Sequence, residues 1–356
     1  MQKIGIAGIG NISKIYLDNL TGMFGKKVKL AGAADADFSR AEKAASEYKI
    51  KAFKSVDEML KSKDVDIILN LTPHKLHFNI ALAAVKAGKH VYNEKPLCTK
   101  REEAAQLQEA ASKKGVRVGG APDTFLGAGH QTCRKLIDDG WIGTPVAATA
   151  FIMSRGPEHW HPAPEFFYKD GGGPMFDMGP YYLTALVNLL GPVARVSGEA
   201  KISMPTRTIT NQTQYGALID VEVPTHIAGV LSFKSGAVGT IITSFDVYSH
   251  TLPWIEIYGT EGTLRCPDPN TFGGPVFVKR FREEEWSKIP LVKNYPENSR
   301  GLGVTEMALA IEGNSPHRAS AELASHVLDI MHGIHDACSS GRYYRIKSKC
   351  KRPNAL

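Results

Sequence analysis

The first 120 residues alternate between short apolar segments and longer segments with helical spacing, and this rhythm limits the possible folds more than any other feature. "KIGIAGIG" at residues 3–10 is followed by a segment whose apolar residues recur every three or four positions. "VDIILNLTP" at residues 65–73 is almost continuously apolar, which is typical of a strand covered on both faces. Repeated strand–helix alternation predicts a parallel sheet joined by right-handed crossovers.

The rhythm changes after residue 121. Several strands then follow one another without long helices between them, and short turns at residues 234–236 and 260–262 predict antiparallel neighbours. We therefore expect an α/β protein in three parts: an N-terminal Rossmann domain (residues 1–121), a C-terminal α+β domain with a large, mostly antiparallel open sheet (residues 122–342), and a basic C-terminal tail (residues 343–356).

The composition favours a cytoplasmic protein that acts on small molecules. The formal net charge is +7, but many basic residues lie in the tail from Gly341, which we interpret as a solvated, partly frayed end, and no nucleic-acid motif is present. The chain has no apolar run long enough for a membrane span, and its N-terminus begins with a strand pattern instead of a signal peptide. Five scattered cysteines without a C-x-x-C pair favour a reducing compartment and disfavour a zinc site.

A glycine-rich turn connects the first strand to the first helix. Glycine at two positions lets the backbone turn tightly and approach a pyrophosphate, which the helix N-terminus can then bind. The third glycine of the usual dinucleotide fingerprint is replaced by Ser13, so a plain tight turn remains an alternative. The residues expected to bind the cofactor here are Gly8, Gly10, Asn11 and Ile12.

Asp35 lies at the carboxyl end of the second expected strand. From this position its carboxylate can accept hydrogen bonds from the adenosine ribose hydroxyls, which favours NAD. The nearest basic residue that follows is Arg40, already within a helix, so NADP is less favoured but not excluded. The alternative role for Asp35 is that of a helix N-cap or turn residue.

Two further clusters follow strands whose carboxyl ends share one edge of the sheet, where doubly wound sheets bind their ligands. The first contains Thr72 and Pro73, which we expect beside the nicotinamide ribose, and His77, which can bind cofactor or simply pack at a helix start. The second is Glu94-Lys95-Pro96, in which we expect Glu94 and Lys95 to contact the cofactor. The ammonium of Lys95 can hydrogen-bond a substrate hydroxyl and ease its deprotonation.

Asp177 and Tyr181 are four residues apart in an expected helix, which places a carboxylate and a phenol on one face. A phenol near a lysine ammonium can have a lowered pKa and serve as a general acid or base. The alternative is an aspartate that the helix dipole favours and a tyrosine that belongs to the core.

Four residues are candidates for substrate binding: Asp123, His159, Trp160 and His161. The last three lie in a loop rich in proline, glycine and aromatic residues, where indole and imidazole groups can contact a polyhydroxylated ligand; an ordinary packed loop is the alternative. Two histidines at positions i and i+2 also suggest a metal, but no third ligand is evident, so we expect no metal site.

Three segments together resemble the Gfo/Idh/MocA family of glucose–fructose oxidoreductase and inositol dehydrogenase: "KIGIAGIGNIS", "TPHKLHFNIALAAVKAGKHVYNEKPL" and "GGGPMFDMGPYYLTALVNLLG". The resemblance covers nearly the whole chain. It implies NAD(P)-dependent hydride transfer to or from a carbinol carbon of a sugar, cyclitol or related polyol, and a homodimer or homotetramer formed through the C-terminal sheet. It also suggests a cis bond before Pro96.

The resemblance implies catalytic roles for Lys95, Asp177 and Tyr181. Tyr181 stands where the family usually has a histidine. Glucose–fructose oxidoreductase and dihydrodiol dehydrogenases resemble this chain in having a tyrosine there, credited as the acid or base, so the mechanism of inositol dehydrogenase is not expected to be copied unchanged. Two rival functions remain: a noncatalytic dinucleotide-binding sensor, and a lyase or glycosidase that uses transient oxidation.

Overall fold

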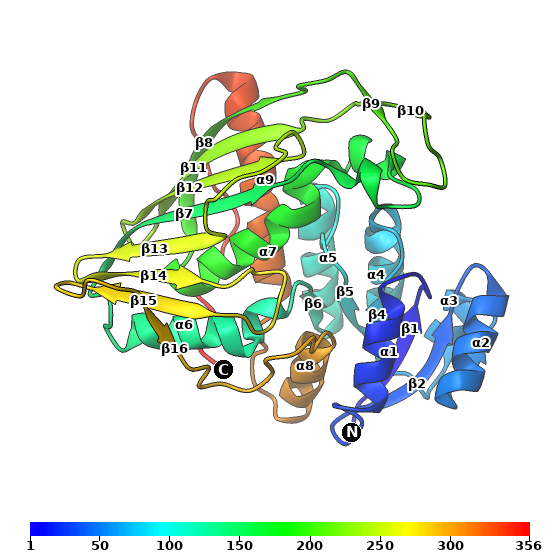
Figure 1. The fold of residues 1–356 in the computed structure, drawn as a ribbon. Coiled ribbons are helices and arrows are strands. Elements are labelled where there is room, and N and C mark those ends of the chain that lie inside the picture. Colours follow the sequence, from blue (N-terminus) through cyan, green and yellow to red (C-terminus); the bar gives the residue numbers. More distant parts are fainter. The chain divides into compact units, whose positions relative to one another are not determined.

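A computed structural model describes residues 1–356, and the chain divides into two compact units (Figure 1). Unit 1 contains residues 1–126 and 297–328, and unit 2 contains residues 127–296 and 329–356. Unit 1 holds a parallel sheet with helices, and unit 2 a mixed, mostly antiparallel sheet. The predicted fold class is therefore confirmed.

Unit 1 is built on a six-stranded sheet with the order β3-β2-β1-β4-β5-β6, in which every pair of neighbours is parallel. The strands are β1 (Lys3–Ala7), β2 (Lys29–Ala34), β3 (Lys51–Phe53), β4 (Ile67–Asn70), β5 (His90–Asn93) and β6 (Val118–Gly120). The connecting helices are α1 (Ser13–Thr21), α2 (Phe38–Tyr48), α3 (Val56–Lys61), α4 (His77–Lys86) and α5 (Arg101–Lys114).

The register of this sheet aligns the ends of its central strands. Ala7 pairs with Asn70, Asn70 with Asn93, and Asn93 with Gly120. The loops that follow β1, β4 and β5 therefore leave the sheet at one edge, which is the edge where the sequence places the cofactor motifs.

A second part of the chain, residues 297–328, completes unit 1. It contains α8 (Leu302–Glu312), which contacts β6 and buries Leu302, Val304 and Met307. The predicted division at residue 121 treats this segment as part of the second domain, so the structure differs from it here. The sequence does not indicate where α8 begins, because its N-cap is Gly301, no side chain caps it, and its first turn contains no charged residue.

Unit 2 contains a nine-stranded sheet with the order β16-β15-β14-β13-β7-β12-β11-β8-β17. Only β7 and β12 are parallel neighbours. The strands are β7 (Pro145–Met153), β8 (Val193–Lys201), β11 (His226–Phe233), β12 (Val238–Ser244), β13 (Ile255–Gly259), β14 (Gly262–Cys266), β15 (Val276–Arg280), β16 (Ser287–Ile289) and β17 (Tyr344–Arg345). Both predicted tight turns join antiparallel neighbours, β11 with β12 and β13 with β14.

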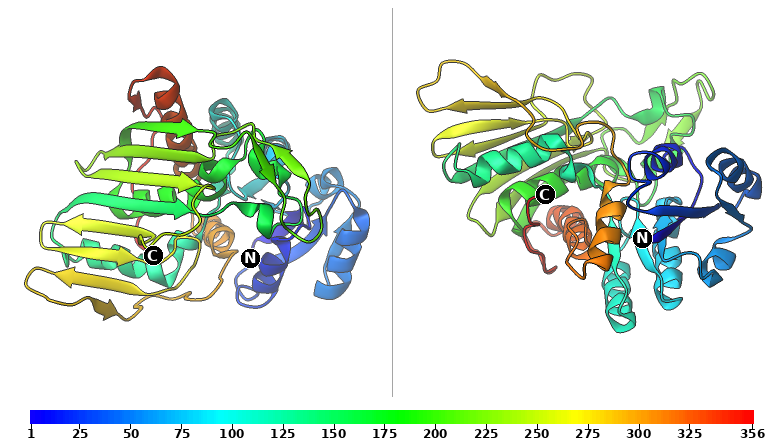
Figure 2. Two further views of the ribbon diagram at one scale, coloured as in Figure 1. Left: turned by 45° about the horizontal axis from the view of Figure 1, so that its top comes forward. Right: turned by 90° about the horizontal axis from the view of Figure 1, so that it is seen from below.

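Helices α6 (Ala128–Asp138) and α7 (Gly173–Leu190) cover one face of this sheet, and Figure 2 shows that the other face carries no helix. Side chains alternate accordingly along the strands, because successive residues of a strand point to opposite faces. Ile241 and Leu231 are buried under the helices, whereas Val146, Val230 and Val238 are exposed on the open face. The last long helix, α9 (Ala321–Ser340), begins in unit 1 and continues into unit 2.

The basic C-terminal tail is tied to unit 2, in contrast to the frayed end expected from the sequence. Strand β17 pairs with β8, and the guanidinium of Arg352 donates to Asp138 and to the carbonyl oxygens of Asn188 and Leu189. The backbone N–H of Leu356 donates to Gln131 at 2.7 Å. The positive charge of Arg352 thus binds acceptors at the C-terminal ends of α6 and α7. No helix of the structure has the length and apolar character needed to cross a membrane.

Candidate active site

The loop after β1 has the geometry of a dinucleotide cradle. Gly8 has φ +95°, and a Cβ there would lie 2.8 Å from the backbone N of Thr72, so only glycine fits without displacing the loop after β4. A Cβ at Gly10 would meet no atom within 4 Å, so the space beside Gly10 is open. Asn11 is exposed, and Ile12 is the N-cap of α1 but offers no side-chain oxygen to the first turn. These are conditions under which a helix N-terminus can bind an anion such as a pyrophosphate.

Asp35 fastens this cradle to the end of β2. Its Oδ2 accepts the backbone N–H of Ile9 at 2.6 Å, and its Oδ1 accepts that of Asp37 at 2.9 Å. The N-cap of α2 is Asp37, which accepts from the N–H of Ser39, so Asp35 is not the N-cap. The bond from the N–H of Asp37 to Asp35 agrees with the other alternative, that of a turn residue. The carboxylate of Asp35 is half-buried beside the glycine loop, as a ligand of ribose hydroxyls requires. The donor and acceptor set of this cradle therefore fits NAD.

Two buried asparagines, missed in the sequence reading, organise the loops after β4 and β5. Asn70 donates from Nδ2 to Oδ1 of Asn93 at 3.1 Å, and its own Oδ1 accepts the hydroxyl of Thr72 at 2.7 Å. Asn93 donates to the carbonyl oxygen of Leu97 at 2.9 Å. One amide pair thus fixes the cofactor loop at Thr72 and the turn that contains Lys95. The signal available in the sequence was an asparagine at the end of each of two adjacent strands.

His77 lies at the start of α4 and is 1% exposed. Its Nδ1 lies 2.7 Å from the carbonyl oxygen of Pro96, and its Nε2 lies 2.8 Å from that of Thr72. The ring therefore bridges the same two loops as the asparagine pair. This agrees with the packing alternative for His77 and gives it no free polar atom for direct contact with a cofactor. Burial lowers its pKa, against the hydrogen bonds to Pro96 and Thr72.

Glu94 connects the Lys95 turn to α1. Its Oε1 accepts the hydroxyl of the buried Tyr16 at 2.6 Å, and its Oε2 accepts the backbone N–H of Lys95 at 2.9 Å. Burial, and next the charge of Glu94, raises the pKa of Tyr16 well above its usual value. Lys95 itself is half-buried, and the Lys95–Pro96 peptide bond is cis, as the family resemblance suggested. Pro73 lies between Thr72 and the short helical turn that leads to His77.

Asp123 was predicted to bind substrate, but the structure gives it a structural position. It is 1% exposed, and its Oδ2 accepts the backbone N–H groups of Gly301 and Gly303 at 3.0 and 2.9 Å. It therefore joins the end of β6 to α8 within unit 1. Burial raises the pKa of Asp123 to about 6, although the N–H of Gly303 and the charge of Arg300 oppose this.

Asp177 and Tyr181 lie one turn apart on α7, as the spacing predicted. Asp177 is half-buried, and Tyr181 is 8% exposed. Both belong to unit 2, whereas Lys95 belongs to unit 1. Each group is thus presented by a rigid element of its own unit, Lys95 by a strand end and the other two by a long helix.

The segment with His159, Trp160 and His161 lies in the loop between β7 and α7. It begins in a short 3-10 helix, η3 (Pro157–His159), and a second one, η4 (Glu165–Tyr168), follows. His159 and Trp160 are exposed, and the ring of His161 lies 5.3 Å from that of Trp160 and 5.1 Å from that of Phe167. An exposed indole supported by aromatic neighbours is available to a ligand. No group of three His, Cys, Asp or Glu side chains lies close enough to hold a metal ion.

Two family models match the chain: one for an oxidoreductase family with an NAD-binding Rossmann fold (GFO_IDH_MocA) at residues 2–121, and one for the GFO/IDH/MocA C-terminal domain at residues 130–265. The chain belongs to the GFO/IDH/MocA family. This confirms the predicted family, the predicted class of NAD-dependent oxidoreductase and the predicted NAD cofactor.

The curated relatives of this family member include a 1,5-anhydro-D-fructose reductase of Ensifer adhaerens, 28% identical over 90% of this chain and 92% of the relative. A scyllo-inositol 2-dehydrogenase (NAD(+)) of Bacillus subtilis is 27% identical over 74% of this chain and 72% of the relative. Among solved structures, an NAD binding oxidoreductase from Klebsiella pneumoniae has a TM-score of 0.84 at 23% identity, covering 98% of this chain and 99% of that one. A levoglucosan dehydrogenase has the same TM-score at 18% identity, with the same coverage.

Proposed function

We propose that the enzyme transfers a hydride between NAD and a carbinol or keto carbon of a sugar, cyclitol or related polyol. The observation that carries this proposal is the arrangement at the carboxyl edge of the parallel sheet. The glycine cradle and Asp35 lie at this edge, and the Asn70–Asn93 pair holds the turn of Lys95 beside the cofactor loop. A reactive ammonium and a dinucleotide site thus share one rigid framework.

In the oxidation direction, we assign the proton of the substrate hydroxyl to the phenolate oxygen of Tyr181. Lys95 orients that hydroxyl for its deprotonation. Asp177 positions the substrate or the lysine. When bound, NAD⁺ supplies the acceptor for the hydride that leaves the carbinol carbon. The reverse direction uses the same groups, with Tyr181 returning the proton to the carbonyl oxygen.

The preference for NAD over NADP rests on Asp35. Its carboxylate is fixed by two backbone N–H groups at the end of β2, so a 2′-phosphate at this position would meet a negative charge that cannot move away. The nearest cation along the chain, Arg40, pairs with Asp37 at 3.4 Å. NADPH is therefore expected to bind more weakly than NADH.

The substrate class is supported by the names of the relatives, which act on 1,5-anhydro-D-fructose and scyllo-inositol, and by a neighbour solved with NADH and L-sorbose. We also propose that the open face of the unit 2 sheet, with Val146, Val230 and Val238 exposed, pairs with a second copy of the chain.

Free cysteines, three of them buried, support a reducing cytoplasm as the location.

A panel of sugars, cyclitols and their keto forms, scanned for a change in NADH absorbance, tests the proposal. Lys95→Ala should lower kcat at least about 1,000-fold, because it removes the cation that assists proton transfer, while the Kd for NADH changes little. Unchanged turnover would remove Lys95 from the mechanism. NADH binding without turnover of any substrate would favour a sensor. Product formation without net change in NADH would favour a lyase or glycosidase.

A further inference from the structure

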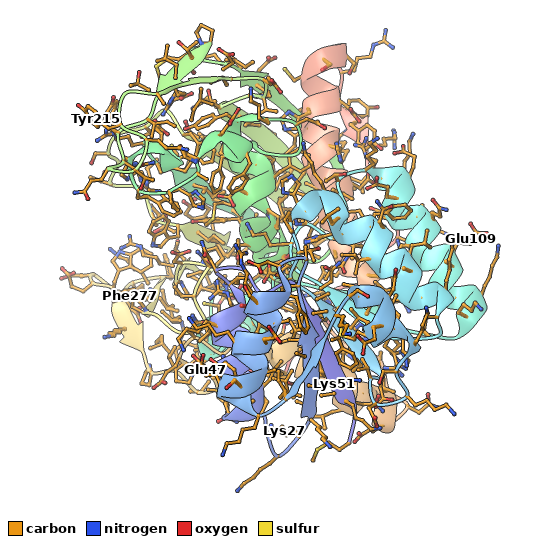
Figure 3. The ribbon with its side chains drawn as sticks, turned by 90° about the vertical axis from the view of Figure 1, so that its right-hand side faces the viewer. Lys27, Glu47, Lys51, Glu109, Tyr215 and Phe277 are labelled. Atoms are coloured by element: carbon orange, nitrogen blue, oxygen red, sulfur yellow. The ribbon has the colours of Figure 1, made fainter.

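The loop between β7 and α7, residues 154–172, is held by a hairpin that is distant in sequence. The hairpin consists of β9 (Thr206–Thr208) and β10 (Leu218–Asp220), forms a separate two-stranded sheet, and lies between β8 and β11 in the chain. Its connecting residues reach outward, and Tyr215 lies at the outer edge in Figure 3. The start of this connection, at Thr210 and Asn211, contacts the loop, whereas Tyr215 farther along it is exposed.

Arg207 in the middle of β9 makes the principal connection. Its Nε and Nη2 donate to Oε1 of Glu158 at 3.0 and 2.5 Å, and its Nη1 donates to Oδ1 of Asp246 at 2.7 Å. Nη2 also donates to the carbonyl oxygens of Arg155 and Phe245 at 2.6 and 2.9 Å. Arg207 and Glu158 are only 6% and 7% exposed. Since all three guanidinium nitrogens are engaged, the orientation of this side chain is fixed.

Glu158 makes further hydrogen bonds, to Tyr168 of the loop and to two residues of the hairpin connection. Its second carboxylate oxygen accepts the hydroxyl of Tyr168, and its backbone carbonyl accepts the N–H groups of Thr210 and Asn211 at 3.0 and 3.1 Å. The side chain of Asn211 donates to the carbonyl oxygen of His161 at 2.7 Å. The hairpin thus grips the chain on both sides of His159 and Trp160.

A small apolar cluster seals the contact between the loop and the hairpin. Its buried members come from the loop, the hairpin and the strand end at residue 245: Phe167, Tyr168, Ile209, Ile219, Val221 and Phe245. Gly156 lies against the charged groups with φ +104°, where a Cβ would be 2.9 Å from Nη2 of Arg207. The cluster and Gly156 thereby keep water from the ion pair between Arg207 and Glu158. Removing one of these two side chains lowers the free energy of unfolding strongly, because the other charge stays buried without its partner.

We propose that Arg207 is a positioning residue that determines substrate specificity by holding Trp160 in place through Glu158. The inference rests on the proposed function and deepens it. Trp160 is 61% exposed, and its ring makes T-shaped contacts with the rings of His161 and Phe167, so an apolar aromatic surface is accessible to a ligand. Such a face suits the C–H surface of a ring, a pyranose or cyclitol, better than an open-chain polyol.

The experiment compares Arg207→Met with wild type in steady-state kinetics on a cyclic and an open-chain polyol. Arg207→Met removes all donors but keeps much of the side-chain volume. We expect KM for the cyclic substrate to rise about tenfold or more, kcat to fall less, and the preference for cyclic over open-chain substrate to shrink. The Kd for NADH should stay within about twofold of wild type, because we expect the Trp160 loop to contact the substrate and not the cofactor. Arg207→Lys should restore part of the KM.

Acrylamide quenching of Trp160 fluorescence gives a second measurement that does not depend on activity. Three other tryptophans contribute background, so wild type and Arg207→Met are each compared with their Trp160→Phe counterparts. We expect Trp160 to become more accessible in Arg207→Met and to stay unchanged in the control Arg265→Met, whose partner Glu256 lies on β13 of the nine-stranded sheet. Because Arg265 lies over the ring of Trp286 at 4.4 Å, this control is also compared with its own Trp160→Phe counterpart. If Arg207→Met does not fold, Arg207→Lys and Asn211→Ala replace it.

The proposal would be overturned if folded Arg207 variants kept the KM, the substrate preference and the Trp160 quenching of wild type. A wild-type protein that binds NADH but turns over no polyol would contradict the proposed function alone, because the quenching comparison still reports whether Arg207 orders the loop. A uniform fall in kcat with all substrates, at unchanged KM, would also overturn a role in specificity.

Discussion

The two regions that carry the candidate site are held in different ways. The strand ends of unit 1 are fixed by neutral amides, a buried imidazole and backbone carbonyls, as in the Asn70–Asn93 pair and His77. The loop of unit 2 is fixed by a buried guanidinium shared between Glu158 and Asp246. The first framework is built from residues close to the strands they end, and the second from residues about 50 positions apart. The cofactor loops are thus held by contacts between neighbouring strand ends, and the Trp160 loop by contacts with a hairpin that is distant in sequence.

Arg207→Met should produce the largest loss of stability among the changes considered. Removing one member of a buried ion pair typically costs about 3–5 kcal/mol, because the remaining carboxylates lose their compensation. Urea unfolding of unit 2, followed by the fluorescence of its tryptophans, measures this loss. A change below about 1 kcal/mol would mean that water enters the contact and that the two regions are less different than their burial indicates.

Gly8→Ala should weaken NADH binding at least about 100-fold, equivalent to about 2.7 kcal/mol. Its Cβ would collide with backbone atoms of Leu71 and Thr72 at about 3 Å, and φ is positive. Gly10→Ala is the matched variant, since its Cβ meets no protein atom. We expect it to keep wild-type thermal stability and still lose affinity for NADH. Isothermal titration with NADH measures the affinity of both variants, and thermal unfolding measures their stability. Normal affinity for NADH in Gly10→Ala would place the cofactor elsewhere.

The pH dependence of stability should show a contribution from Asp123. Its pKa is raised to about 6 in the folded protein, so between about pH 4 and 6 the folded state holds one proton more than the unfolded state. The associated stability is fully present below the unfolded pKa and falls by about 1.4 kcal/mol per pH unit as the pH rises toward 6. Asp123→Asn keeps an oxygen acceptor but cannot titrate. Denaturant unfolding of both proteins at pH 4, 5, 6 and 7 measures this difference. The free energy of unfolding of wild type should fall relative to that of Asp123→Asn between pH 4 and 6, and a constant difference between the two proteins would contradict the assignment.

Glu109→Gln should have the smallest effect. Glu109 pairs with Lys113 at 2.6 Å on the surface of α5, where both side chains are exposed and water screens their attraction (Figure 3). We expect the melting temperature and the kinetic constants to stay within error of wild type. A measurable loss here would show that exposure is a poor guide to the strength of ion pairs in this protein, and would weaken the contrast drawn from Arg207.

The sequence predicts the cofactor region well because its signals are local. A strand, a glycine turn and a helix follow one another within residues 3–21, and the Glu94-Lys95-Pro96 triplet directly follows a strand. Asp177 and Tyr181 were placed on one helix by their spacing alone. Their roles in catalysis stay predictions.

Other features depend on contacts that no local pattern indicates. Asp123 follows a strand like a ligand residue, yet α8, some 180 positions later, supplies the N–H groups that it accepts. The hairpin that contains Arg207 has strands of only three residues, too short to show a periodicity. The sequence suggests a solvated tail because the acceptors for Arg352 are two backbone carbonyl oxygens and Asp138, more than 160 positions away, and no local pattern indicates these contacts.

The return of residues 297–328 to unit 1 has a consequence for synthesis on the ribosome. When residues 1–126 have emerged, Asp123 lacks its partners in Gly301 and Gly303, and β6 lacks the cover of α8. These contacts form only after about 170 further residues, including eight of the nine strands of the large unit 2 sheet, have been translated. The nucleotide-binding half is therefore the first to be started and among the last to be finished, so a nascent chain truncated before residue 297 exposes an incomplete cofactor domain to chaperones and proteases.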